Sequence, residues 1–112
     1  MAAKFEIKTA ANGQFHFNLK AGNGEVILTG ETYTSKPDAL SGIASVRVNA
    51  PVDERYVRKT STSGQPYFTL KAANGEPLGR SEMYSSPAAM ENGIASVKAN
   101  APGATLDDQT GV

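Results

Sequence analysis

The sequence predicts an α+β fold built from two copies of one unit, and three observations support this. The stretch Lys20–Pro51 returns 51 residues later as Lys71–Pro102, and the match extends back without a gap to Phe5 and Tyr56. Within each copy, the period of the apolar residues changes from two, which is typical of strands, to 3.6, which is typical of helices. Only Val52–Arg55 separates the two aligned copies, a join too short for a flexible linker. The copies are therefore expected to share one core.

Each copy opens with three predicted strands. In the first copy, Phe5–Thr9 and Phe15–Lys20 alternate apolar and polar residues, and Glu25–Thr29 is rich in β-branched residues. Between them lie Asn12-Gly13 and Asn23-Gly24, and Asn-Gly is the dipeptide best able to adopt the positive φ angles of a tight hairpin turn. Three strands joined by two short turns predict an antiparallel meander.

A helix is predicted to follow the meander. Ser35 is a good N-cap, and Asp38 three residues later completes the acidic form of the capping box. Asn49 is expected to adopt the left-handed turn at the other end, where Pro51 stops the helix. The face expected to be buried carries apolar residues at helical spacing: Ala39, Ile43, Val46 and Ala50.

A glycine beside this apolar face occurs in both copies, as Gly42 and Gly93. Glycine inside a helix costs about 1 kcal/mol relative to alanine, so a second occurrence needs a reason. We interpret it as a close backbone approach of the helix to the sheet or to the other helix.

The second copy repeats this order with changes in the strands. Its strands are predicted at Arg55–Thr60, Tyr67–Lys71 and Leu78–Arg80, its helix starts at Ser86 with Pro87, and Ala104–Asp107 could add a last strand. Phe15 and Val26 become Pro66 and Pro77. Proline cannot donate to a strand ladder, so both belong at strand starts or at an edge. The second half is therefore expected to carry the more exposed edge.

The repeated motifs resemble those of a known family. NGQ-x-F, LKA-x-NGE and the helix run Gly42–Val46, repeated within Asn92–Lys98, look like the bacterial YegP-like domains, small tandem-repeat proteins of unknown function. The resemblance covers about residues 4–107. It implies a tandem repeat of a three-strand, helix, strand unit (about 4–54 and 55–107) in a single domain, residues 1–112. One antiparallel sheet would carry two helices on one face, and the repeats would exchange their last strands.

Composition excludes several classes of function. Eleven basic residues balance eleven acidic ones, so nothing marks a phosphate-backbone binder. The absence of cysteine removes disulfides, thiolate nucleophiles and sulfur-ligated metals. The start lacks the apolar core of a secretory signal, and no apolar run approaches the roughly 20 residues that span a bilayer. We expect a cytoplasmic monomer with an internal pseudo-two-fold axis and no membrane contact.

No catalytic, cofactor-binding or metal-binding set can be recognised in the sequence. His16 is the only histidine, and its counterpart is Tyr67, so a general base is not kept in both copies. Gly22-Asn23-Gly24 leads into a strand, whereas a dinucleotide loop leads into a helix. The acidic pairs Asp53-Glu54 and Asp107-Asp108 fit solvated loops at repeat ends. An enzyme is therefore the least favoured class, and neither a cofactor nor a metal is expected.

The repeated loop between the third strand and the helix is the best candidate for a recognition surface. Glu31, Tyr33, Glu82 and Tyr84 recur there, while their neighbours have changed. A purely structural interpretation is also open: tyrosine would pack on the core edge, and glutamate would face the positive helix end. The favoured function is a small non-enzymatic module that binds a protein or small molecule. The alternative is single-stranded nucleic acid on the open sheet face, around His16, Asn18 and Tyr67, although nucleic acid is the less favoured partner.

Overall fold

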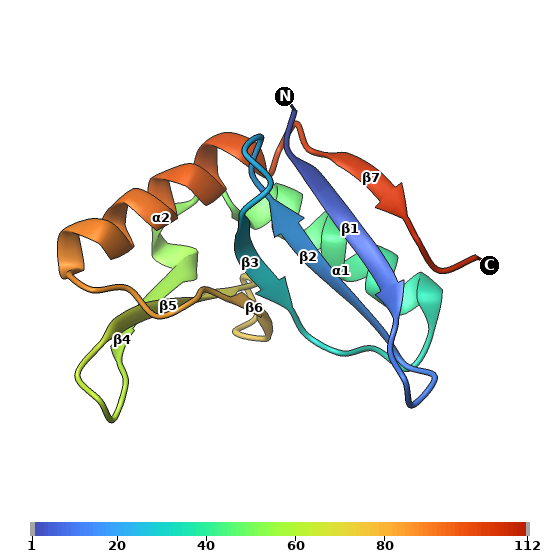
Figure 1. The fold of residues 1–112 in the computed structure, drawn as a ribbon, viewed down its shortest axis with the longest axis horizontal. Helices are drawn as coiled ribbons and strands as arrows, with labels where there is room; N and C mark the ends of the chain where they lie inside the picture. The colour runs from blue at the N-terminus through green and yellow to red at the C-terminus, as the bar shows by residue number, and fades with distance from the viewer. Residues whose placement is uncertain (1, 112) are drawn as a thin grey trace.

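A computed structural model describes residues 2–111 as seven strands, two α-helices and one short 3-10 helix (Figure 1). The elements follow the order that the sequence predicts, with boundaries that differ by one or two residues. They are β1 (Lys4–Thr9), β2 (Phe15–Lys20), β3 (Val26–Gly30), α1 (Lys36–Asn49), η1 (Asp53–Arg55), β4 (Tyr56–Thr60), β5 (Pro66–Lys71), β6 (Pro77–Arg80), α2 (Pro87–Asn100) and β7 (Thr105–Asp108).

All seven strands form one sheet in the order β4-β5-β6-β3-β2-β1-β7. The two halves meet where β3 pairs antiparallel with β6, through Thr29 opposite Arg80 and Gly30 opposite Gly79. Thr29 and Arg80 are equivalent residues of the two copies, so the pseudo-two-fold axis passes through this pair. The α+β architecture is confirmed, but one strand pair departs from the expected antiparallel sheet. β7 runs parallel to β1, and the sheet is mixed.

The expected exchange of last strands occurs in one direction only. β7 follows the second helix and lies beside β1 of the first half (Figure 1). The segment after α1 forms η1 and then becomes β4, which within residues 2–111 pairs with β5 alone. The reason is covalent. The segment that follows α1 itself forms β4, the first strand of the second copy, so it cannot also lie beside β4 as an added strand. One outer edge of the sheet is therefore β7, and the other is β4.

The hairpin turns and their neighbouring bulges shape both halves in the same way. Gly13 has a φ angle of 82° and Gly24 one of 85°, as predicted, but no asparagine among the described residues adopts a positive φ angle. Beyond the second turn the register shifts between Leu19 and Lys20, so that two residues of β3 stand opposite one residue of β2. Such a bulge re-aims side chains. As a result, Ile27 and Leu28 are both buried, and the same shift in the second half buries Leu78.

Serine caps start both helices, as predicted. The Ser35 hydroxyl accepts a hydrogen bond from the Asp38 N–H at 3.2 Å, and Ser86 makes the equivalent contact in the second copy. The predicted left-handed turn at Asn49 is wrong, because Asn49 is helical and the following Ala50 has a φ angle of −55°. The Asn49 side chain instead donates to the Ser45 carbonyl at 2.8 Å, which explains its presence in both copies.

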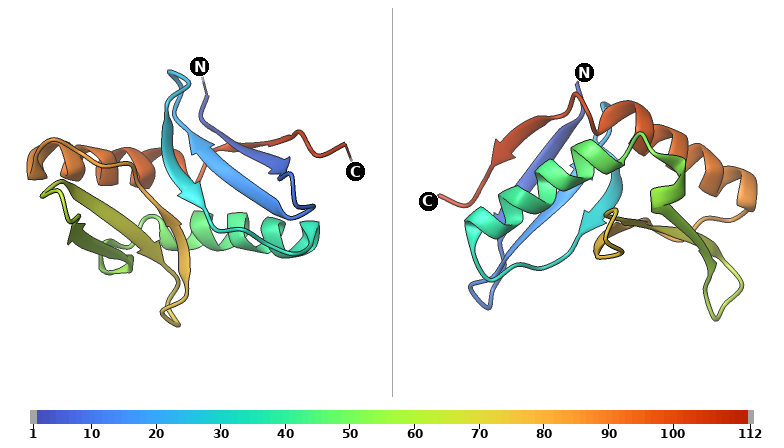
Figure 2. Two further views of the ribbon diagram at one scale, coloured as in Figure 1. Left: turned by 60° about the horizontal axis from the view of Figure 1, so that its bottom comes forward. Right: turned by 180° about the vertical axis from the view of Figure 1, so that it is seen from behind.

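The core lies between the helices and one face of the sheet. Phe5, Ile7, Phe17 and Leu19 of the first half and Phe68 and Leu70 of the second are fully buried there, together with Ile43 and Val46 of α1 and Ile94 and Val97 of α2. In the right panel of Figure 2, α1 lies in front of β1 and β2. Pro66 and Pro77 begin β5 and β6, as predicted. Within residues 2–111, no helix lies on the opposite face of the sheet (Figure 2).

Candidate functional site

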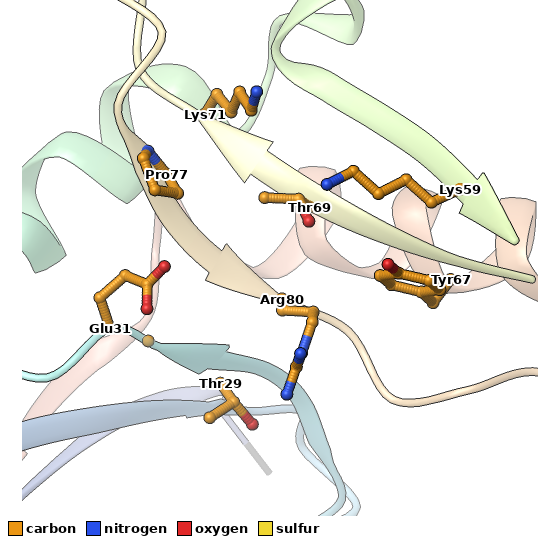
Figure 3. Close-up of a pocket in the computed structure, with 9 residues that line it drawn as sticks. Thr29, Glu31, Lys59, Tyr67, Thr69, Lys71, Pro77 and Arg80 are labelled. Carbon is orange, nitrogen blue, oxygen red and sulfur yellow. The ribbon is translucent and has the colours of Figure 1, made fainter. Parts of the chain in front are cut away.

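A basic groove of about 410 Å³ lies on the helix-free face, where the two halves of the sheet meet (Figure 3). Its position follows from strand alternation, because Phe68 and Leu70 of β5 point into the core and their neighbours point the other way. We call it the basic groove, and it is lined by Thr29, Gly30, Glu31, Lys59, Tyr67, Thr69, Lys71, Pro77 and Arg80. In Figure 3, Lys59 extends toward Thr69 and Arg80 reaches toward Thr29.

The charge of the groove is unbalanced. Lys59, Lys71 and Arg80 line it with only one acidic residue, Glu31. Within residues 2–111, none of these four side chains forms an ion pair or a hydrogen bond. The groove therefore offers three cations whose charges are not neutralised by the protein.

The equivalent lysines of the first half are neutralised. Lys8 and Lys20 are the counterparts of Lys59 and Lys71, and their ammonium groups each lie 3.1 Å from a carboxylate oxygen of Glu6. The counterpart of Glu6 is Val57. This one substitution removes the acidic partner from the second half.

Glu6 itself is an unexpected buried charge. Sequence alternation places it on the helix-free face, yet only 4 % of its surface is exposed. Gln109, which follows β7, also donates to Glu6 at 3.0 Å. Burial alone would raise the pKa of Glu6, but hydrogen bonds and the positive charges of Lys8 and Lys20 outweigh it, and the pKa lies below its usual value.

The two tyrosines of the predicted recognition surface pack on the helices. A Cβ atom at position 42 would lie 2.7 Å from the Tyr33 Cζ, and one at position 93 would lie 2.6 Å from the Tyr84 Cζ. The rings are also nearly parallel to Phe17 and Phe68, with centroids 6.1 and 6.4 Å apart. The predicted close approach at the helix glycines is therefore present, but it is made by a side chain of the preceding loop.

Both tyrosine hydroxyls hold their protons more tightly than a free tyrosine. Burial raises the pKa of Tyr33 and of Tyr84, and neighbouring carboxylates, chiefly Glu31 and Glu82, raise it further. A raised pKa does not suit a general base at neutral pH. The tyrosines can still donate a hydrogen bond.

The two glutamates of the predicted surface lie apart from each other on either side of Arg80. Glu31 lines the basic groove, and Glu82 lines a neighbouring hollow of about 440 Å³ that also includes Arg80 and Asn18. Both glutamates are exposed. The structure thus brings the acidic residues near the pseudo-two-fold axis, while the tyrosine rings face the helix glycines.

The remaining residues considered from the sequence gain no catalytic partners. His16 lies on β2 directly opposite Lys8, a position equivalent to that of Tyr67 opposite Lys59. No group of three His, Cys, Asp or Glu side chains in residues 2–111 could hold a metal ion. Over the same residues, no helix is both long and apolar enough to cross a membrane.

The basic groove was missed from the sequence because the net charge is zero, although the change from Glu6 to Val57 was visible in the alignment of the copies.

Comparison with known proteins identifies the family. The model of a domain of unknown function, DUF1508, matches residues 10–56 and again residues 61–108. The chain belongs to the DUF1508 family. It is 58 % identical over 110 residues to a UPF0339 protein of Bordetella pertussis, covering 98 % of each chain. It is 54 % identical to YegP of Escherichia coli K12, covering 98 % of this chain and all of that protein. The YegP-like resemblance is confirmed.

Solved structures of relatives show the same fold. The solution NMR structure of Escherichia coli yegP superposes with a TM-score of 0.93, at 54 % identity, covering all of this chain and 97 % of that one. The solution NMR structure of a UPF0339 protein from Shewanella oneidensis gives a TM-score of 0.92 at 50 % identity and covers 98 % and 93 % of the two chains. The names of these relatives carry no activity, so function has to be argued from the site.

Proposed function

We propose that this DUF1508 chain is a small non-enzymatic binding module that takes an anionic ligand in the basic groove. The observation that carries the proposal is that Lys59, Lys71 and Arg80 have no ionic partner among residues 2–111, whereas Lys8 and Lys20 pair with Glu6. Lysines without an ionic partner are common on protein surfaces. Here, however, the lysines at two equivalent positions are paired in the first half and unpaired in the second half of the same chain. An incoming anion would supply the charge that Glu6 supplies in the first half.

The groove suits binding better than catalysis. Its lining holds neither histidine nor serine, and within residues 2–111 no hydrogen bond joins its single carboxylate, Glu31, to the hydroxyl groups of Thr29, Tyr67 or Thr69. General acid–base and nucleophilic mechanisms need paired groups within hydrogen-bond reach. The proposal therefore includes no reaction, and it keeps the expectation of a cytoplasmic monomer.

The repeated loop residues take two roles in this proposal. Glu31 forms the acidic rim of the groove, and Glu82 lies on the other side of Arg80. Both carboxylates would repel a ligand whose negative charge extends past Lys59, Lys71 and Arg80, so they would favour small anions. Tyr33 and Tyr84 hold the loops on the helices. The four residues thus remain a recognition surface, with the glutamates outermost.

A change of one residue tests the proposal. Val57→Glu places in the second half the residue that the first half already has, and it should neutralise Lys59 and Lys71. Pyrophosphate, added to the ¹⁵N-labelled full chain, should shift the amide resonances of Lys59, Tyr67 and Lys71 in the wild type and leave them unmoved in Val57→Glu.

Glu6→Val is the matched variant, because it should free Lys8 and Lys20 and create a second response around His16. Equal shifts at every exposed lysine in the wild type would mean that the probe only screens surface charge. Undiminished binding to Val57→Glu would also contradict the proposal.

Single-stranded nucleic acid is a second candidate ligand, because an aromatic ring lies among the cations. Tyr67 lies directly opposite Lys59 on the helix-free face, and bases stack on aromatic side chains of such sheets. A thymidine oligonucleotide of about eight nucleotides should then bind with an affinity that falls as salt rises, and Tyr67→Ala should weaken it more than Tyr67→Phe. No binding at low salt would exclude this candidate while leaving the smaller anions to be tested.

A further inference from the structure

The hollow of about 440 Å³ beside the basic groove is the counterpart of the groove under the pseudo-two-fold axis. Three of its lining residues correspond to lining residues of the groove: Asn18 to Thr69, Val26 to Pro77 and Glu82 to Glu31. Thr29 and Arg80, which exchange places under the axis, line both. We call it the second hollow, and it adjoins the groove along this residue pair on the helix-free face.

The charge of this surface does not follow the symmetry of the fold. Lys8 and Lys20, the counterparts of the groove lysines, pair with Glu6, and neither lines the second hollow. Among the described residues that do line it, Arg80 is the one cation, and it is shared with the groove. Glu82 has no ionic partner within residues 2–111. An anionic group is therefore favoured in the groove and disfavoured in the second hollow.

The second hollow offers apolar contact instead. Val26 lines it and is partly exposed, and Met83 lines it with 40 % of its surface exposed. Leu28, the third apolar lining residue, is fully buried. Methionine is unbranched and adapts its shape to different apolar groups. Small-molecule sites commonly combine apolar contacts with a few placed polar groups, and here the two parts lie side by side.

We propose that the basic groove and the second hollow together bind a phosphate monoester that carries an uncharged apolar chain. The phosphate lies among Lys59, Lys71 and Arg80, and the chain passes Arg80 toward Met83. The proposal rests on the proposed function, because the groove supplies the anion site, and it adds the class of the remaining part of the ligand.

The sheet sets the length of the chain. Lys59 extends toward Thr69 of β5 (Figure 3), Thr69 stands opposite Arg80 of β6, and Arg80 stands opposite Thr29 of β3. Two strand spacings amount to about 10 Å. A chain of about six carbon atoms is comparable with this distance.

Two phosphate monoesters that differ in chain length test the proposal. Methyl phosphate and hexyl phosphate should both shift the amide resonances of Lys59 and Lys71 in the isotope-labelled full chain, and hexyl phosphate should also shift the methyl resonance of Met83. Hexyl phosphate should bind about tenfold more tightly, which corresponds to about two buried methylene groups at about 0.8 kcal/mol each. Hexan-1-ol, which has the chain without the charge, should not saturate the Met83 shift over the same concentrations.

Met83→Thr places in the second half the residue that the first half has at position 32. It should lower the ratio of the hexyl phosphate affinity to the methyl phosphate affinity several-fold, and the exposure of Met83 makes a loss of the fold unexpected. Val48→Thr is the matched control, because Val48 is 73 % exposed and lies on α1, away from the helix-free face. The ratio should be unchanged in this variant.

The outcomes separate this proposal from the one on which it rests. Equal affinities for the two phosphates, or a ratio that Met83→Thr leaves unchanged, would overturn the chain site and leave the basic groove standing. Tighter binding of hexane-1,6-diyl bisphosphate than of hexyl phosphate would also overturn it, because a second anion would then be accepted beside Glu82. An absence of saturable shifts at Lys59 and Lys71 with either phosphate would refute the groove, and the two-part site with it.

Discussion

Gly42→Ala tests whether the repeated helix glycine exists to make room for the repeated tyrosine. In a solvent-facing helix position the change gains about 1 kcal/mol of helix propensity. Here the new Cβ would lie 2.7 Å from Tyr33 Cζ and 3.2 Å from Tyr33 Cε2, closer than carbon atoms pack. Overpacking of this kind costs about 1–3 kcal/mol, and the ring cannot swing away without losing its contact with Phe17. We therefore expect a net loss of about 1 kcal/mol of unfolding free energy.

The control is a glycine without such a neighbour. A Cβ added at Gly103 would have nothing within 4 Å, and the residue has no positive φ angle, so Gly103→Ala should be neutral or gain up to about 1 kcal/mol. Urea unfolding followed by circular dichroism at 222 nm, a wavelength that reports about equally on both helices, gives both values with their m-values. The unfolding free energies of the two alanine variants should differ by about 1–2 kcal/mol, with Gly42→Ala the less stable.

A second substitution identifies the clashing group. Tyr33→Phe removes the hydroxyl but keeps Cζ, so it should relieve Gly42→Ala only in part. Tyr33→Leu removes the ring, and on that background Gly42→Ala should cost little or become stabilising. An increase in stability of Gly42→Ala in the wild-type background, with an unchanged m-value, would refute the close packing of tyrosine and glycine.

Two further predictions concern pH and cooperativity. The pKa of Glu6 is lower in the folded state than in the unfolded chain, so its contribution to stability is present above the ordinary value of about 4.3 and is lost as pH falls through the folded pKa. Glu6→Gln should therefore flatten the decline of the urea midpoint between about pH 5 and pH 3, and an unchanged decline would mean that Glu6 is not the group responsible. Because β7 joins the second half to β1, the full chain should unfold in one transition, and residues 1–54 alone should be unfolded or should dimerise. A stable monomer of that fragment would contradict the shared core.

Local patterns were sufficient to predict the elements and the two-copy architecture. The alternation of Phe15–Lys20, the Asn-Gly turns and the Ser35 cap each act within a few residues, so their structural consequences can be derived without tertiary contacts. The wrong prediction at Asn49 is also local in origin. Asparagine tolerates the left-handed conformation, but here a hydrogen bond to the preceding helical turn satisfies its side chain.

Features that depend on distant segments could not be derived in this way. Glu6 is buried because Gln109, more than a hundred residues away, covers it together with two lysines. The parallel pairing of β7 with β1 arises from the path of the chain after α2, and alternation alone does not specify the direction of a partner strand. The basic groove combines residues of β3, β4, β5 and β6, and the balanced net charge conceals it.

Positions that are identical in the two copies and positions that differ between them support different conclusions. Some residues that are identical in the two copies contact one another within each half: Tyr33 packs on Gly42, and Asn49 bonds to Ser45, with the same contacts in the second copy. Their identity is explained by packing within each half, and it does not require a ligand. The helix-free face keeps its two lysines, but the residues around them differ between the copies: His16, Asn18 and Thr29 have become Tyr67, Thr69 and Arg80, and Glu6 has become Val57. Stability does not demand these changes on an open face, so we expect function to lie there and to be one-sided, despite the two-fold symmetry of the fold.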